Sequence, residues 1–342
     1  MTVLKKSIFC RICCHLLVGV LSLYWGLTTS HAWAQGSSAT VPATYPAKTV
    51  TVLVPQAAGG TNDFVARVLA AKLAELTGQG FAVENKPGAG GNIGTQAAAK
   101  APADGYTLLV TINSAMAINP ALYKTPGFDP VRDFVPIGLV ATVPNVLVVN
   151  SATPYGNLQA FINAARAAPN TLQYVSAGNG TLNHLLGEML SLDTGIKMQH
   201  IPYKGVAPAL NDILGGQVPR GFASLPSALP HIRSGKLRAL GVSGARRSAA
   251  APDIPAIGET VPGFGAELWV AVFAPKGTPV GVTRAVEAWL AKALDDKDLQ
   301  ARLAGQGAEL GKPAYGNALA SMLRSDLLKW DKIVKKSGAK ID

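Results

Sequence analysis

The residues best suited to chemistry lie in two short glycine-containing stretches. The first reads VPQAAGGTND over residues 54–63, and the second reads SAGNGT over residues 176–181. Each follows a short apolar run and precedes an amphipathic pattern, so each predicts a turn between a strand and a helix. Glycine lets backbone approach a ligand closely, and the N–H groups at a helix start favour an anion. Placed on facing lobes, the two turns would hold a small carboxylate or phosphate from both sides; plain connecting turns are the alternative interpretation.

The beginning of the chain has the pattern of a secretory signal peptide over residues 1–34. Basic residues precede an apolar segment over 16–27, and residues 32–34 read Ala-Trp-Ala, a small-x-small cleavage signature. All three cysteines lie in this segment, so the mature chain is expected to have neither disulfides nor cysteine-bound metals. Because no later run is long and apolar enough to cross a bilayer, we expect a soluble, exported protein.

The charge distribution argues against a nucleic-acid partner. The chain has 342 residues and a formal net charge of +11. Its basic residues are spread along the sequence, without a stripe and without interleaved aromatic residues. We interpret the surplus as a mild attraction for anionic solutes, with a solvated basic surface as the alternative.

Strand-like runs alternate with helical patterns along the mature chain, which predicts an α/β fold with largely parallel sheets. One run, Ile137–Val149, is long and contains Pro144, which would remove a ladder hydrogen bond from a continuous strand. We therefore expect this run to leave one sheet and enter another. The expected organisation is two lobes joined by two crossovers: lobe 1 from residues 45–143 plus about 265–342, and lobe 2 from about 144–264.

Several motifs, taken together, resemble the substrate-binding proteins of tripartite tricarboxylate transporters, the Bug or TctC family. They include YPAKTVTVLVPQAAGGTNDFVAR, ENKPGAGGNIG, SAGNGTLNH and LPSALPHIRSGKLRALGVS, and they span nearly the whole mature chain. The resemblance implies a two-lobe Venus-flytrap fold of the type II periplasmic binding class. It also implies a small mono-, di- or aromatic carboxylate bound largely through backbone N–H groups and ordered waters. Membrane transporter subunits would be the partners of a monomeric receptor, and no cofactor is implied.

The resemblance also assigns candidate ligand-binding residues, position by position. Two places depart from the commonest family pattern: Gln56 replaces an aromatic lid with an amide, and Ala223-Ser224 occupies a stretch where many members carry an aspartate. We expect Tyr203 to line the pocket or to have a structural role. The remaining candidates are Ala58, Gly59, Gly60, Thr61 and Asp63 in the first turn, Asn113 and Ser114 after the third strand, and Ser176, Ala177, Gly178, Gly180, Thr181 and His184 in the second.

A secreted α/β enzyme acting on a small acidic substrate is the alternative function. The sequence contains no nucleophile elbow, no phosphate-binding loop and no closely placed pair of carboxylates. Its mature histidines, His184, His200 and His231, lack the spacing of metal ligands. We therefore expect no catalytic residue and no metal, and His200 is expected in packing or at the surface.

Overall fold

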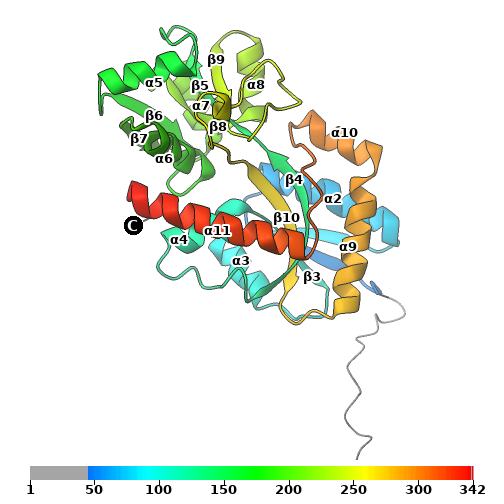
Figure 1. The fold of residues 1–342 in the computed structure, drawn as a ribbon. Helices are drawn as coiled ribbons and strands as arrows, with labels where there is room; N and C mark the ends of the chain where they lie inside the picture. The colour runs from blue at the N-terminus through cyan, green and yellow to red at the C-terminus, as the bar shows by residue number, and fades with distance from the viewer. Residues whose placement is uncertain (1–44, 340, 342) are drawn as a thin grey trace, which may run out of the picture. The chain divides into compact units, whose positions relative to one another are not determined.

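The computed structural model describes residues 45–339 and residue 341, which form two five-stranded sheets with helices around them (Figure 1). The predicted signal peptide lies outside the described residues. The first sheet has the order β2 (Phe81–Asn85), β1 (Val50–Val54), β3 (Thr107–Ile112), β10 (Leu268–Pro275) and β4 (Phe134–Val143). The second has the order β7 (Met198–Pro202), β6 (Leu172–Ser176), β8 (Arg220–Ser224), β5 (Asn145–Asn150) and β9 (Leu237–Val242).

Helices cover both sheets, as expected of an α/β fold. Those associated with the first sheet are α2 (Thr61–Thr77), α3 (Asn92–Ala99), α4 (Asn119–Leu122), α9 (Val280–Leu294), α10 (Lys297–Gly305) and α11 (Asn317–Ser337). Those of the second are α5 (Leu158–Ala167), α6 (Leu182–Thr194), α7 (Val206–Leu214) and α8 (Leu225–Arg233). Short helical turns occur at Ala89–Gly91, Ser114–Ile118 and Ile257–Glu259. No helix in this part of the chain is long and apolar enough to span a membrane.

Each sheet is mixed: four of its five strands run in one direction, in line with the expectation of largely parallel sheets, and one strand is reversed. In the first, β1 is parallel to β2 and β3, whereas β10 is antiparallel to β3 and β4. In the second, β6 is parallel to β7 and β8, whereas β5 is antiparallel to β8 and β9. The reversed strands, β5 and β10, are the ones that the chain enters directly from the other sheet.

The predicted long run is two strands that meet at Pro144. β4 belongs to the first sheet and β5 to the second, so the chain changes sheets across this one residue. Proline has no N–H to donate, while the Pro144 carbonyl accepts a hydrogen bond from the Leu225 N–H at 2.9 Å. The chain returns to the first sheet between Val242 and Leu268. The strand β8, RGFAS, is short and contains arginine and glycine, so apolar periodicity alone does not predict it.

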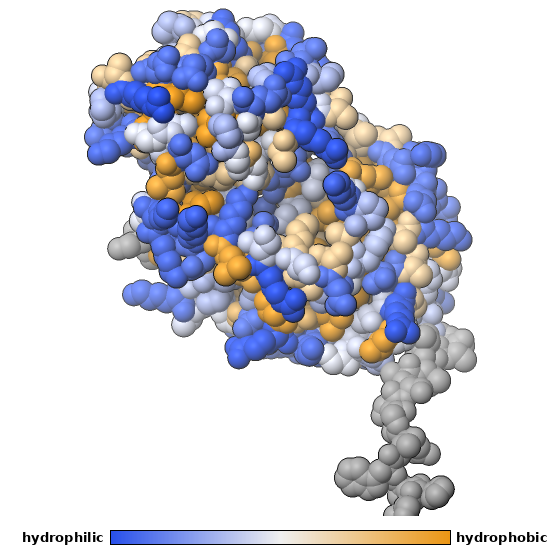
Figure 2. All heavy atoms as spheres, in the orientation of Figure 1, coloured by the Kyte–Doolittle hydropathy of each residue, from blue (hydrophilic) through white to orange (hydrophobic). Residues whose placement is uncertain are grey.

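One hydrophobic core continues from the first sheet to the second. It includes Leu109 of β3, Leu147 of β5 and Trp330 of α11, each almost fully buried. Helix α11 contacts both α4 and α6, so the end of the chain covers elements of both sheets. On the face drawn in Figure 2, hydrophobic residues occur in small groups among hydrophilic ones. Burial of apolar area across this shared core stabilises the arrangement of the elements that carry the candidate site.

Candidate functional site

The first glycine turn exposes the start of helix α2. Gly59 has φ +82°, in the left-handed region that favours glycine, and Gly60 precedes the helix in extended backbone without a side-chain cap. The first N–H groups of any helix have no carbonyl four residues earlier within the helix to bond. In α2 these groups belong to Thr61, Asn62 and Asp63. They therefore offer a partial positive charge to an anion placed before the helix.

Asp63 holds the shape of this turn. Its carboxylate accepts hydrogen bonds from the Gly59 N–H at 2.9 Å, from Arg67 Nε at 3.0 Å and from Asn85 Nδ2 at 2.9 Å. Although burial alone would raise it, the pKa of Asp63 is lowered by the hydrogen bonds from Arg67, Gly59 and Asn85. The side chain is buried beneath the turn. Asp63 thus has a structural partner for its charge, and the Gly59 N–H is already used.

A cavity of ≈ 340 Å³ lies in front of the turn. Its far wall comes from the start of α8 and from the segment after α10, so it lies between elements of the two sheets. Ser224 precedes α8 without capping it, and its Oγ lies 2.6 Å from the Ser227 Oγ. A larger cavity of ≈ 670 Å³, lined by Arg246 and Glu309 among others, does not include the glycine turn. We place the candidate site at the smaller one, whose lining is Gly59, Gly60, Thr61, Phe64, Pro226, Ser227, Gln306 and Ala308.

Gln56 points away from this cavity, behind the turn. Its Oε1 accepts a hydrogen bond from Asn62 Nδ2, and a Cβ added to Gly91 would lie 2.8 Å from its Nε2. Among the described residues, the buried Nε2 has no hydrogen-bond partner. In this arrangement Gln56 supports the start of α2 from beneath.

The second glycine turn uses its own N–H groups internally. The Gly178 N–H donates to Ser176 Oγ at 3.0 Å, and the Gly180 N–H donates to His184 Nδ1 at 3.2 Å. Thr181 Oγ1 donates to the Gly178 carbonyl at 2.7 Å and accepts weakly from the His184 N–H at 3.4 Å. Unlike α2, helix α6 therefore begins with a side-chain cap. Two of the amides that we expected to face a ligand are held by side chains instead.

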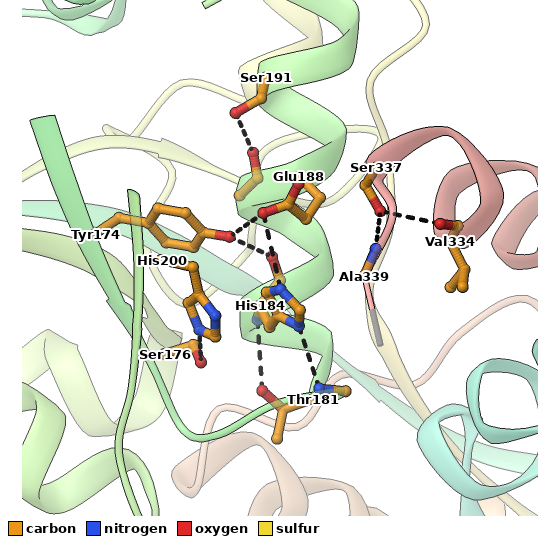
Figure 3. Close-up of polar contacts among 12 residues, drawn as sticks. Tyr174, Ser176, Thr181, His184, Glu188, Ser191, His200, Val334, Ser337 and Ala339 are labelled. Atoms are coloured by element: carbon orange, nitrogen blue, oxygen red, sulfur yellow. Dashed lines mark hydrogen bonds and ion pairs between the residues drawn. The ribbon is translucent and has the colours of Figure 1, made fainter. Parts of the chain in front are cut away.

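Two histidines, His184 and His200, lie beneath this turn (Figure 3). The sequence indicated only His184 as a candidate here and placed His200 in packing or at the surface. The rings of His184 and His200 stack with centroids 3.9 Å apart and planes 14° apart. His200 Nε2 lies 2.6 Å from Ser176 Oγ. Burial lowers the pKa of His184 to about 4, and burial together with the neighbouring His184 lowers the pKa of His200 to about 3. Both imidazoles are therefore neutral at pH 7.

The second turn does not line the cavity at the first. A Cβ added to Gly180 would lie 2.6 Å from Ile341 Cδ1 and 2.9 Å from Leu122 Cδ1, so this turn rests on α4 and the end of the chain. Ala177 is half-buried, and its carbonyl accepts from the Gly205 N–H at 3.1 Å. The structure thus brings Gly59, Gly60 and Thr61 together with the start of α8, and the 176–184 stretch lies apart from them.

The remaining candidates have mixed positions. Asn113 is buried and donates from Nδ2 to the Glu267 carbonyl at 2.8 Å, which ties β3 to the returning crossover, and Ser114 begins the next helical turn. Ala58 is exposed, whereas Ala223 is buried in β8. The Tyr203 hydroxyl donates to Asp212 Oδ2. Among the described residues, no group of three or more His, Cys, Asp and Glu side chains could hold a metal ion.

Five lining residues are not among the sequence candidates: Phe64 of α2, Pro226 and Ser227 at the start of α8, and Gln306 and Ala308 after α10. Pro226 and Ser227 belong to the segment LPSALP, residues 225–230. A serine and a proline at a helix start signal an N-terminus, but only the fold places that N-terminus opposite Gly60.

The two sheets, joined by two crossovers around an interlobe cavity, define a two-lobe periplasmic binding protein fold. The chain belongs to the tripartite tricarboxylate transporter receptor family, TctC, whose family model matches residues 65–339. The protein BugT of Bordetella pertussis is 38% identical over 300 residues, covering 87% of this chain and 92% of that protein. The family resemblance seen in the motifs is therefore confirmed.

Solved structures of related receptors agree with this assignment. The periplasmic binding protein BugD is 37% identical with a TM-score of 0.74, over 86% of this chain and 99% of that one. An R. palustris protein with adipate is 35% identical with a TM-score of 0.78, over 87% and 100%. MatC from Rhodopseudomonas palustris, with bound malate, is 31% identical with a TM-score of 0.74, over 85% and 100%. The expected role of solute receptor is confirmed at the level of this family.

Proposed function

We propose that the protein is a periplasmic receptor that captures a small carboxylate between its lobes and delivers it to the membrane subunits of a tripartite transporter. The observation that carries the proposal is the uncapped start of α2 at an interlobe cavity of ≈ 340 Å³. Carboxylates suit such a site because helix N–H groups and the helix dipole both favour negative charge. The adipate and malate of the related structures have the same chemistry.

The proposed binding mode uses both lobes. Lobe 1, residues 45–143 plus about 265–342, would bind one carboxylate end through the backbone of Ala58, Gly60 and Thr61, since the Gly59 N–H is bonded to Asp63. Lobe 2, residues about 144–264, would contribute the start of α8, where Ser227 lines the cavity. Closure about the two crossovers would bring the 176–181 turn, including Ser176 and Thr181, toward the guest, with His184 behind the turn. Asn113 and Ser114, beside the crossover, would line the base of the same cleft.

A secreted enzyme is the second candidate, and it differs in what happens to the guest. Calorimetry against a panel containing adipate and malate measures binding, and chromatography of the recovered solute measures conversion. We expect a panel member to bind with one-site stoichiometry and to be recovered unaltered. Steady conversion of the bound acid would overturn the receptor proposal.

The guest itself can be identified without a panel. Protein purified from its native host is denatured, and the extract is analysed by mass spectrometry for small acids. We expect a carboxylic acid at close to one equivalent per chain. A stoichiometric guest without a carboxylate would contradict the proposal.

A further inference from the structure

The stacked pair of His184 and His200 is hydrogen-bonded to the second glycine turn. His184 lies on α6 and His200 on β7, and each contacts the 176–181 turn through one ring nitrogen. His184 Nδ1 accepts the Gly180 N–H directly. His200 Nε2 meets Ser176 Oγ, which accepts the Gly178 N–H. Both glycine amides of the turn are thus fixed by the same stacked pair.

The hydrogen bond from Gly180 determines the tautomer of His184. A nitrogen that accepts an N–H hydrogen bond carries no proton, so neutral His184 has its proton on Nε2. That Nε2 lies 3.7 Å from Glu188 Oε1, which is occupied by the Tyr174 hydroxyl at 2.8 Å. A second proton on His184 could enter only at Nδ1, where it would face the Gly180 N–H and abolish the bond.

The surroundings oppose a charge on either ring. The side chains of His184 and His200 are stacked on each other, and Tyr174 of β6 lies 5.0 Å from His200 between ring centroids. Glu188 of α6 is the nearby acid, and burial raises its pKa, so it offers little negative charge as compensation in acid. The nearby cations are lysines of α11: the charges of Lys329, Lys332 and Lys336 oppose the rise that burial causes in the pKa of Asp193, at the far end of α6. Helix rise places Asp193 about 14 Å along the axis from His184.

We infer that His184 and His200 are positioning residues of the second glycine turn, and that His184 acts only as the neutral Nε2–H tautomer. The pair sets the backbone of residues 176–181 without contacting the guest. Where the receptor closes on a carboxylate, as proposed above, its affinity then depends on His184 remaining unprotonated. The affinity effect rests on the proposed function. The protonation state of the two rings and the hydrogen bonds of the turn do not depend on it.

The first test therefore uses the ligand-free protein. Two-bond nitrogen–proton spectra of the mature chain labelled with 15N-histidine report the tautomer of each ring between pH 7 and pH 4. We expect one ring to be a pure Nε2–H tautomer that stays neutral at pH 5.5, and we expect this signal to disappear in His184→Leu. A rapidly averaging pair of tautomers, or a His184 that titrates near pH 6.5, would overturn the inference whether or not any carboxylate binds.

The second test uses affinity and a conservative replacement. His184→Asn offers an amide oxygen close to the position of Nδ1, whereas His184→Leu offers no acceptor. With the carboxylate that binds the wild type, we expect His184→Leu to bind about tenfold more weakly and His184→Asn to recover most of the loss. Wild-type affinity should also fall below pH 5, while His184→Asn keeps a flatter profile. Equal affinity of the two variants, each shown to be folded, would refute the positioning role.

If wild type binds no carboxylate at all, the proposed function fails while the tautomer measurement still decides this inference. If carboxylates bind normally and the ring titrates freely, the receptor function stands and the inference fails.

Discussion

Replacing Gly60 with valine tests the candidate site with little risk to the fold. Gly60 has φ −81°, a value open to any residue, and an added Cβ would lie 3.5 Å from the Ala57 carbonyl oxygen, an ordinary contact. Gly60→Val should therefore fold, at a cost of about 0.5–1 kcal/mol because valine is a poorer helix N-cap than glycine. Gly60 lines the ≈ 340 Å³ cavity, however, so we expect the added isopropyl group to take up space that the guest needs.

The size of the effect follows from the hydrogen bonds that are blocked. A hydrogen bond to a charged group is worth about 1.5–3 kcal/mol, so losing one from the guest carboxylate weakens binding roughly 10- to 100-fold. The assay is calorimetry with the carboxylate that the wild type binds, combined with urea unfolding of both proteins. Loss of affinity with only a small fall in the unfolding midpoint is the expected result.

Gly156→Val is the matched control. Gly156 is exposed, its φ lies outside the left-handed region, and an added Cβ would meet nothing within 4 Å. The control makes the same substitution in lobe 2 without touching the cavity, so its affinity should equal that of the wild type. Unaltered affinity in folded Gly60→Val, or equal losses in both variants, would refute the placement of the guest at α2.

Three further predictions concern the residues that shape the two turns. Asp63→Asn should lower the free energy of unfolding by about 2 kcal/mol in urea melts, because Arg67 and the Gly59 N–H lose a charged acceptor; equal midpoints would contradict this. Gly180→Ala should cost about 2 kcal/mol, since φ +73° and contacts with Ile341 and Leu122 both oppose a side chain; a variant as stable as wild type would be inconsistent with the packing. The His184 pKa of about 4, against 6.5 ordinarily, means that the unfolded chain binds the proton first. The contribution of His184 to stability is then complete above pH 6.5 and falls by about 3 kcal/mol toward pH 4. Melts across pH should show this as the difference in slope between the wild type and His184→Asn.

Periodicity predicted most elements of the fold correctly. Strand-turn-helix units at Val50–Thr77 and Leu172–Thr194 follow from apolar alternation and glycine placement, and Pro144 predicted the change of sheet. The direction of β5 and β10 was not predictable in the same way, because strand polarity depends on where the chain enters a sheet and not on local composition.

The candidate site was only partly predictable from the sequence. Glycine and threonine at a helix start indicate exposed N–H groups, which holds for Gly60 and Thr61. The same pattern at Gly178 and Gly180 does not reveal that Ser176 and His184 occupy those amides, because these bonds depend on side-chain orientation. The opposing wall at Ser227 comes from residues distant in sequence, so only the three-dimensional fold brings it to the cavity.

The order of strands along the chain has a practical consequence for protein engineering. All strands of the second sheet are contiguous in sequence, from β5 to β9, whereas β10 returns to complete the first sheet. The central segment is therefore a cassette with two junctions, one at Pro144 and one between Val242 and Leu268. Chimeras that exchange this cassette with BugD or BugT would reveal which half of the molecule dictates solute preference, without redesigning any individual contact.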